Sequence, residues 1–250
     1  MAVTRLTLRH PAGVTPVVVG DGALGSFAQD IEGWIADRTV FVITTPRVWK
    51  LHGEMLEPFL QKAGTCNRFE VPEGEAAKSV ATAERLWGKM LTGGGKRDSR
   101  VVAFGGGSVG DLAGFAAGCF LRGVSFLQIP TTLLAQVDAA IGGKTGINLP
   151  EAKNSVGLFC HPWATVSETG FLKTLPVQEL RAGLLEVVKQ NDPKAFAAAL
   201  SSLEQVGTFQ FVDTVGYPVR YARKFMHEDG SWQIIAGTDR PLSGADLLGT

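Results

Sequence analysis

The chain is patterned as short apolar runs separated by longer amphipathic or small-residue segments. The six runs predicted to be strands are Pro16–Val19, Val40–Thr44, Arg68–Val71, Val101–Phe104, Phe126–Ile129 and Ala164–Ser167. Between them, apolar residues recur at helical spacing, as in Val80–Leu91 with Ala83, Leu86 and Met90 on one stripe. Strand and helix in alternation predict an α/β fold in which helices cover a parallel sheet.

The pattern changes near Phe171, where the strand-and-helix alternation ends. Pro176 is well placed as the first residue of a helix that runs to Lys189. Leu180, Leu184 and Val187 would form the buried stripe of this helix.

The last part of the chain has a third character. An alanine-rich helix is predicted over Lys194–Leu203. Period-two spacing from Val219 to Phe225, a turn signal at 228–230 and the run Trp232–Ala236 then predict a β-hairpin.

Composition excludes several classes of protein. Lys and Arg number 24, as do Asp and Glu, so the net charge is zero and nucleic acid is not expected as a partner. The longest nearly apolar stretch, Leu112–Leu121, is far shorter than the ~20 residues that cross a bilayer, so no membrane insertion is expected. Cys66, Cys119 and Cys160 lie far apart and outside any CxxC pair, which fits a reducing cytoplasm.

Glycines concentrate where the run Val101–Phe104 ends. Gly105, Gly107 and Gly110 match the pattern GxGxxG, and Gly106 and Ser108 complete the turn into the next helix. Backbone N–H groups at such a helix start can hold a pyrophosphate. The alternative is a tight strand-to-helix turn that needs glycine only for close packing.

A second glycine segment presents a lysine, in the order Gly142, Gly143, Lys144. It resembles part of a P-loop, but GxxxxGK[ST] requires glycine at the position of Asp138, so the ATPase interpretation fails. An acid and an amine around a loop could bind a polar substrate and move protons. A solvated lysine and a helix-capping aspartate remain the alternative.

Two charged pairs also stand out. Glu75 and Lys78 follow a predicted strand; they are either a charged helix start or, for Glu75, an acceptor of ribose hydroxyls. Glu186 and Lys189 share one helix face, where a surface ion pair is the simpler interpretation.

Taken together, these segments resemble the 3-dehydroquinate synthase family. The stretches that carry the resemblance are 126–148, Lys153–Asn154, 171–176 and 181–189, together with Gly105–Asp111 and 74–78. It extends from about residue 10 to about residue 190, and its motifs are long and occur in the family's order.

The resemblance implies a domain organisation. Residues 1–168 would form a Rossmann-like NAD-binding domain, and 169–191 would begin the helical domain that holds metal and substrate. Residues 192–250 match nothing in the family and are expected to form an unassigned α+β tail.

The resemblance also implies a reaction. The family binds NAD and a divalent metal, zinc or cobalt, and is expected to be cytoplasmic. It converts 3-deoxy-arabino-heptulosonate 7-phosphate, a phosphorylated sugar acid, to 3-dehydroquinate and phosphate in the shikimate pathway to chorismate and the aromatic amino acids. NAD oxidises the substrate transiently and is regenerated in each turnover. A homodimer is a family expectation.

Site residues follow from the resemblance position by position. The cofactor-binding residues would be Glu75, Lys78, Gly106, Gly107, Ser108, Asp111, Thr131, Thr132, Lys144, Lys153, Phe171 and Thr174. The substrate and catalytic residues would be Arg122, Asp138, Lys144, Asn154 and Lys189. Glu186 would be a metal ligand.

The metal site is incomplete in this sequence. The family supplies two histidine ligands, one near a Gly-His-x-x-x-His pattern, whereas the histidines here are His10, His52, His161 and His227, none of them in that pattern. Catalytic zinc usually takes three protein ligands, so impaired activity is expected. Other possibilities are another sugar-phosphate cyclase, a metal-dependent alcohol or glycerol dehydrogenase, or a non-catalytic NAD-binding module.

Overall fold

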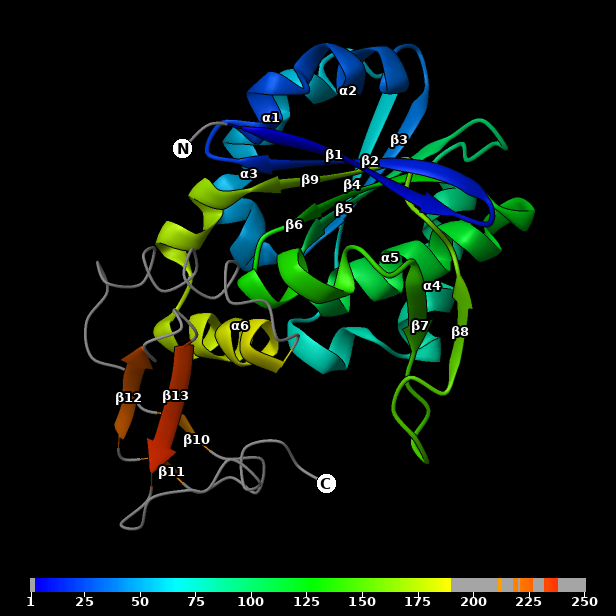
Figure 1. Cartoon of the computed structure of the whole chain (residues 1–250). Helices are drawn as coiled ribbons and strands as arrows, with labels where there is room; N and C mark the ends of the chain where they lie inside the picture. The colour runs from blue at the N-terminus through cyan, green and yellow to red at the C-terminus, as the bar shows by residue number, and fades with distance from the viewer. Residues whose placement is uncertain (1–2, 190–210, 213–217, 220, 227–231, 238–250) are drawn as a thin grey trace. The chain divides into compact units, whose positions relative to one another are not determined.

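The computed structural model of the chain describes residues 3–189, 211–212, 218–219, 221–226 and 232–237. Two units are distinguished along the chain, Met1–Gly183 and Leu184–Thr250. The first unit has an α/β fold, in which helices cover both faces of a β-sheet (Figure 1).

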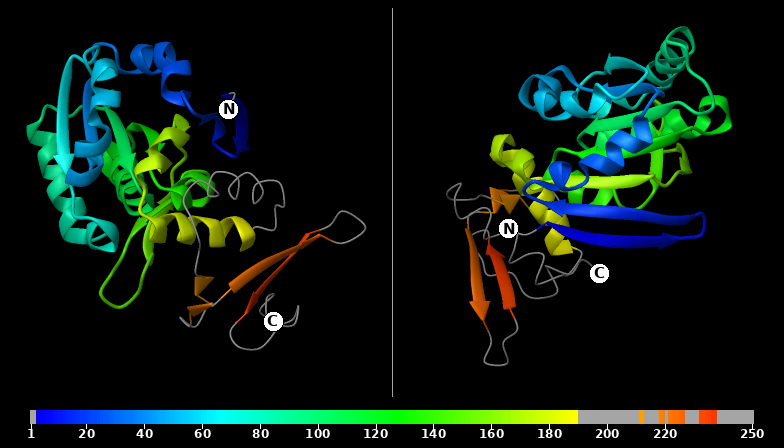
Figure 2. Two further views of the ribbon diagram at one scale, coloured as in Figure 1. Left: turned by 90° about the vertical axis from the view of Figure 1, so that its left-hand side faces the viewer. Right: turned by 90° about the horizontal axis from the view of Figure 1, so that it is seen from above.

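A seven-stranded sheet in the order β1-β2-β9-β6-β5-β3-β4 organises the first unit. Its strands are β1 (Thr4–His10), β2 (Gly13–Gly20), β3 (Thr39–Thr44), β4 (Thr65–Glu70), β5 (Arg100–Gly105), β6 (Ser125–Pro130) and β9 (Ala164–Glu168). All neighbouring pairs are parallel except β1 and β2, which form an antiparallel hairpin at one edge (Figure 2). The predicted parallel α/β fold is confirmed.

The central strands form where the sequence is continuously apolar. Val40–Ile43 in β3 and Val101–Phe104 in β5 are at most 1% exposed, as expected for strands covered on both faces. All six predicted strands are present. The strand β1 was not predicted, because at the edge of the sheet most of its residues are exposed and its sequence mixes charged and apolar residues. The short antiparallel pair β7 (Lys144–Ile147) and β8 (Val156–Phe159) was not predicted either.

Helices cover the two faces of the sheet separately. The helices are α1 (Ala23–Ser26), α2 (Ala28–Ile35), α3 (Pro46–Leu60), α4 (Val80–Thr92) and α5 (Gly107–Cys119), with the shorter turns η1 (Gly74–Ala77), η2 (Phe120–Arg122), η3 (Ala135–Ala139, a π-helix) and η4 (Thr169–Thr174). One buried cluster joins α4 and α5 to the sheet, and a second joins α1, α2 and α3 to the opposite face. The amphipathic pattern of Val80–Leu91 therefore corresponds to α4, which ends one residue later at Thr92.

The connections reverse direction between β3 and β5. The helix after β3, α3, packs on one face of the sheet, whereas the helix after β5, α5, packs on the other. The loops that follow these two adjacent parallel strands therefore run to opposite faces of the sheet. In open α/β sheets, ligands bind in the crevice at such a switch point.

The second unit begins within α6 (Val177–Lys189), which starts one residue after the predicted position at Pro176. Leu180, Leu184 and Val187 of this helix are buried, in agreement with the predicted stripe. Strands β12 (Tyr221–Met226) and β13 (Trp232–Gly237) pair antiparallel, which confirms the predicted hairpin strands.

Two short strands, β10 (Phe211–Val212) and β11 (Pro218–Val219), also pair antiparallel. The predicted helix Lys194–Leu203 and the predicted turn at 228–230 lie outside the described residues. The division into domains at 1–168, 169–191 and 192–250 stays a prediction.

Among the described residues, no helix combines the length and the apolar character that a membrane crossing would require.

Candidate functional site

The turn from β5 into α5 provides the clearest ligand-binding geometry. The strand ends at Gly105, Gly106 is the N-cap in extended conformation, and α5 begins at Gly107. No side chain caps the first backbone N–H groups of α5, and its first turn carries no acidic residue. Helix N-termini carry a partial positive charge and unpaired N–H donors, so this end of α5 suits an anionic group such as a pyrophosphate.

Close packing explains part of the glycine pattern. A Cβ on Gly110 would lie 2.1 Å from Gln128 Nε2, so the buried amide of Gln128 would have to move if any other residue stood there. A Cβ on Gly106 would lie 3.1 Å from Thr132 Cγ2. The packing interpretation therefore accounts for Gly110, while Gly106 and Gly107 leave the helix start open.

Beside this turn, a buried lysine joins three segments. Lys78 is 3% exposed, and its Nζ donates to Asp111 Oδ2 at 2.6 Å and to Asn154 Oδ1. Burial raises the pKa of Asp111, with Lys78 acting against that shift and the charges of Glu75 and Asp138 adding to it. Three of the predicted site residues are thus in direct contact.

Glu75 has both carboxylate oxygens fixed. Oε1 accepts a hydrogen bond from Ser108 Oγ at 3.1 Å, and Oε2 accepts one from Asn148 Nδ2 at 2.8 Å. The hydrogen bond from Asn148 is the largest cause of a lowered pKa at Glu75, followed among the favourable contributions by Lys78, Ser108 and Lys153. Glu75 is therefore an exposed, ionised acceptor next to the start of α5.

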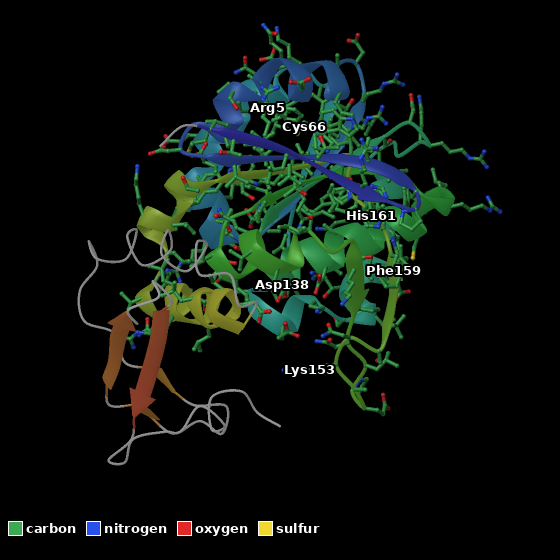
Figure 3. All side chains as sticks on the ribbon, in the orientation of Figure 1. Arg5, Cys66, Asp138, Lys153, Phe159 and His161 are labelled. Atoms are coloured by element: carbon green, nitrogen blue, oxygen red, sulfur yellow. The ribbon has the colours of Figure 1, made fainter. Side chains whose placement is uncertain are left out.

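Asp138 and Lys153 also lie around this site. Asp138 is exposed on η3. The Cβ of the next residue, Ala139, lies 3.4 Å from the position that a Cβ on Gly107 would occupy. Lys153 lies in the loop between β7 and β8 (Figure 3). Both lie near enough to shift a pKa in the cluster. The charge of Asp138 raises the pKa of Asp111, and the charge of Lys153 lowers the pKa of Glu75.

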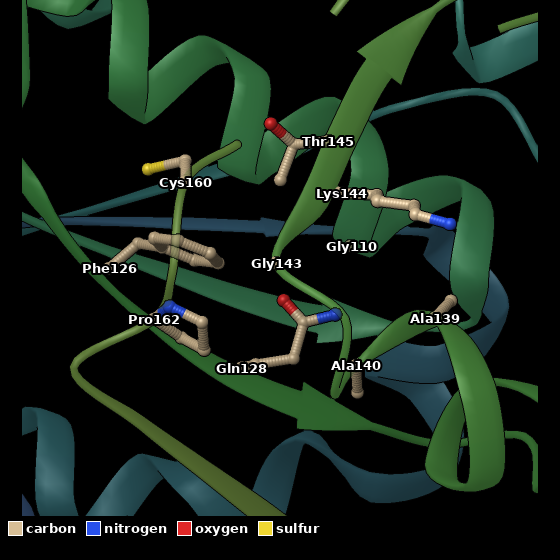
Figure 4. Close-up of a pocket in the computed structure, with 10 residues that line it drawn as sticks. All are labelled: Gly110, Phe126, Gln128, Ala139, Ala140, Gly143, Lys144, Thr145, Cys160 and Pro162. Carbon is tan, nitrogen blue, oxygen red and sulfur yellow. The ribbon is translucent and has the colours of Figure 1, made fainter. Parts of the chain in front are cut away.

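Lys144 opens strand β7 and is exposed. A P-loop lysine opens a helix instead, so the exclusion of that motif agrees with the structure. A small hollow is lined by Gly110, Phe126, Gln128, Ala139, Ala140, Gly143, Lys144, Thr145, Cys160 and Pro162 (Figure 4). Within it, Gln128 Oε1 is buried and has no hydrogen-bond partner among the described residues.

The remaining cofactor candidates lie at the ends of β6 and β9. Thr131 is buried and donates its N–H to Gly105 O at 2.9 Å, while Thr132 caps the next turn through Ala135 N at 3.2 Å. Phe171 is 1% exposed and belongs to the core. Thr174 is exposed, and its Oγ1 lies 2.8 Å from His52 Nε2.

His52 gives a testable pH dependence. Burial lowers the pKa of this histidine, so the unfolded chain binds its proton more readily than the folded chain. Stability should consequently fall as the pH drops below about 6.5, the usual histidine value. His52→Gln keeps a hydrogen-bond donor for Thr174 without titrating, so urea unfolding at pH 7.5 and 5.5 should show a weaker pH dependence in the variant. An unchanged dependence would contradict this assignment.

Arg122 is not brought into the cluster. Arg122 is exposed at the far end of α5, and a helix of that length spans about 20 Å, which separates Arg122 from Gly107. Glu186 and Lys189 lie on the part of α6 that belongs to the second unit. Their predicted substrate and metal roles stay predictions.

The structure adds residues that the sequence did not single out. Asn148 bonds Glu75, Glu168 is a buried carboxylate that accepts three backbone N–H groups, and His52 holds Thr174. Each is a common polar residue outside any glycine motif, and only spatial neighbours reveal its role. Among the described residues, no three His, Cys, Asp or Glu side chains converge as a metal site.

A mostly parallel sheet with an open glycine helix start at its switch point defines an α/β protein with a Rossmann-like fold. Residues 68–182 match the family described as 3-dehydroquinate synthase N-terminal. The chain is 44% identical over 175 residues to a 3-dehydroquinate synthase of Pelotomaculum thermopropionicum, covering 70% of this chain and 47% of that protein. The N-terminal part of the chain belongs to the 3-dehydroquinate synthase family.

Solved structures agree with this membership. A 2-deoxy-scyllo-inosose synthase complexed with carbaglucose-6-phosphate, NAD+ and Co2+ is 27% identical, with a TM-score of 0.68 over 74% of this chain and 50% of that one. The 2-epi-5-epi-valiolone synthase ValA of Streptomyces hygroscopicus, with NAD+ and Zn2+ bound, is 27% identical, with a TM-score of 0.62 over 76% and 59%. The chain spans about half the length of the curated relatives it matches.

Proposed function

We propose that the first unit binds NAD and serves 3-dehydroquinate synthase-type chemistry, the elimination of phosphate from 3-deoxy-arabino-heptulosonate 7-phosphate followed by ring closure. The observation that carries this proposal is the open start of α5 beside the fixed carboxylate of Glu75. When bound, NAD would supply a transient hydride acceptor. Relatives with this chemistry and neighbours holding NAD+ support the assignment.

The proposed roles divide between anion and hydroxyl recognition. Backbone N–H groups at Gly106–Ser108 would receive the pyrophosphate. Glu75 would accept hydrogen bonds from the ribose hydroxyls, because an ionised carboxylate is an acceptor at both oxygens. Lys144 and Asn154 would face the phosphorylated sugar acid, where a lysine can neutralise phosphate or carboxylate charge.

The divalent metal of the family does not fit the described residues. Glu186 is its one predicted ligand, and no group of three suitable side chains converges in the described part of the chain. We therefore propose that the chain by itself has impaired turnover. A cytoplasmic location and a homodimer are proposed with the family assignment, the former supported by three free cysteines.

Nucleotide binding and turnover test these proposals separately. Calorimetry should detect NAD binding and give its dissociation constant. If no binding is detected, the proposed nucleotide site is refuted. Phosphate release from the heptulosonate phosphate, with NAD and zinc present, should be much slower than that of the 3-dehydroquinate synthase of Pelotomaculum thermopropionicum. Equal rates would refute impaired turnover. Net NADH formation from glycerol would instead favour a dehydrogenase.

Gly107→Asp should separate binding from stability. A Cβ here meets only ordinary contact at 3.4 Å, and an acid in the first turn of a helix favours the helix. The same carboxylate would repel a pyrophosphate by about 3 kcal/mol at ~5 Å, so NAD affinity should fall more than tenfold. Gly107→Ala, the matched control, should bind nearly as the original chain does. Equal affinity in both variants, measured by calorimetry, would place the pyrophosphate elsewhere.

A further inference from the structure

Asn148 joins three segments of the first unit. Its backbone N–H donates to Lys78 O at 2.8 Å, and its Nδ2 donates to Glu75 Oε2 at 2.8 Å. Its Oδ1 accepts the backbone N–H of Asn154 at 2.8 Å. One half-buried side chain, directly after β7, therefore contacts both the η1 segment and the loop that carries Lys153 and Asn154.

The loop residue Asn154 is held from two sides. Lys78 Nζ donates to its side-chain Oδ1, while Asn148 accepts its backbone N–H. Its backbone φ is +52°, in the left-handed region that non-glycine residues adopt at a cost. The two hydrogen bonds offset that cost and fix where the amide of Asn154 points.

The carboxylate of Glu75 is also held from two sides. Ser108 reaches Oε1 from the start of α5, and Asn148 reaches Oε2 from the end of β7. An exposed glutamate otherwise rotates among several rotamers, and ordering it on ligand binding costs free energy. With both oxygens held, each still has a free lone pair for a hydroxyl donor.

We infer that Asn148 is a positioning residue for the nucleotide site: it presets the Glu75 carboxylate to receive the two adjacent hydroxyls of a ribose, and fixes the Asn154 loop beside it. Asn148 acts through these residues and does not itself contact the nucleotide. This inference rests on the proposed function.

The charges around Glu75 make the inference measurable by pH. Lys78 and Lys153 stabilise its ionised form, Ser108 donates to it, and the charge of Asp111 interacts unfavourably with it. Asn148 contributes the largest part of the lowered pKa of Glu75. Nucleotide affinity that needs ionised Glu75 is lost as the pH falls through that pKa, so removing Asn148 should move this loss to higher pH.

The experiment measures the NAD dissociation constant by calorimetry from about pH 3.5 to about pH 8, a range that includes the ordinary glutamate pKa and the region below it. Asn148→Ala should weaken binding about tenfold at pH 7.5, the effect of one hydrogen bond to a charged group, and should move the acid-side loss upward. Asn148→Asp keeps an acceptor for the Asn154 N–H and places a second carboxylate beside Glu75. Asn148→Asp should therefore fold, and it should move the acid-side loss of NAD affinity to higher pH than Asn148→Ala does. Asn67→Ala is the control and should match the original chain, because the side-chain amide of Asn67 donates to Gly93 O at 3.4 Å and makes no other hydrogen bond in the described part of the chain.

A double-mutant cycle with Glu75→Gln distinguishes positioning from folding. In the Glu75→Gln background, Asn148→Ala should no longer move the pH profile, because the titrating group is gone. A lower melting temperature with an unmoved acid-side loss would overturn the inference, as would unchanged affinity in both Asn148 variants. If the original chain binds no NAD, the proposed function fails and this inference fails with it. Binding by the original chain that is insensitive to Asn148 refutes the inference alone.

Discussion

Replacing Lys78 by methionine should lower the free energy of unfolding by about 3 kcal/mol at pH 7.5, because it breaks a buried ion pair from one side. Lys78 is 3% exposed and lies 2.6 Å from Asp111, whose side chain is 23% exposed. Without the amine, Asp111 keeps its burial and its unfavourable interactions with Glu75 and Asp138. Chemical denaturation of both proteins measures the loss.

The destabilisation caused by Lys78→Met should become smaller as the pH is lowered. The pKa of Asp111 is raised in the folded chain, and losing Lys78 raises it further, so the folded variant binds the proton more tightly than the unfolded chain. Lowering the pH from 7.5 toward the usual aspartate range then stabilises the folded variant. Lys173→Met is the matched control: its ion pair with Asp21, at 3.1 Å, has side chains 74% and 55% exposed and should contribute less than about 1 kcal/mol. Equal losses in the two variants would contradict the argument.

The second large effect is expected at Glu168, the last residue of β9. Its side chain is 1% exposed and accepts backbone N–H groups of Gly22 at 2.9 Å, Leu24 at 3.2 Å and Gly170 at 3.1 Å. Glu168→Ala leaves these donors without their acceptor at the start of α1 and in η4. At about 1–3 kcal/mol for each buried donor, partly recovered by water, the free energy of unfolding should fall by about 4 kcal/mol.

Two further variants define what Glu168 contributes. Glu168→Gln keeps one acceptor oxygen but turns an N–H donor toward another donor, so an intermediate loss of about 2 kcal/mol is expected. Glu70→Ala removes a surface carboxylate paired with Arg68 at 3.3 Å and should cost less than about 1 kcal/mol. A loss at Glu168→Ala no larger than that of Glu70→Ala would show that water replaces the carboxylate fully.

Local pattern was sufficient for the parallel sheet. The runs Val40–Thr44 and Val101–Phe104 are apolar at every position but the last of the first, and such runs are buried on both faces wherever they pack. The edge strand Thr4–His10 escaped prediction because its pairing with β2, and not its composition, makes it a strand. Its register is a property of two segments together.

The candidate site divides in the same way. The glycine turn at Gly105–Gly107 could be predicted, since a strand, glycines and a helix are consecutive in the sequence. Lys78 resembles a solvated charge at a helix start, yet it is buried because Asp111, 33 residues away, and Asn154, 76 residues away, fold around it.

By itself, the sequence determined the α/β class, the presence of a glycine turn after Val101–Phe104 and the family resemblance of the N-terminal part, because each depends on short motifs of neighbouring residues. Only the tertiary structure decided that Asn148 holds Glu75, that Glu168 is buried, and that Arg122 lies at the opposite end of α5 from the glycine turn. Burial and hydrogen-bond partnership depend on which distant segments meet, and a single residue's type carries no record of that.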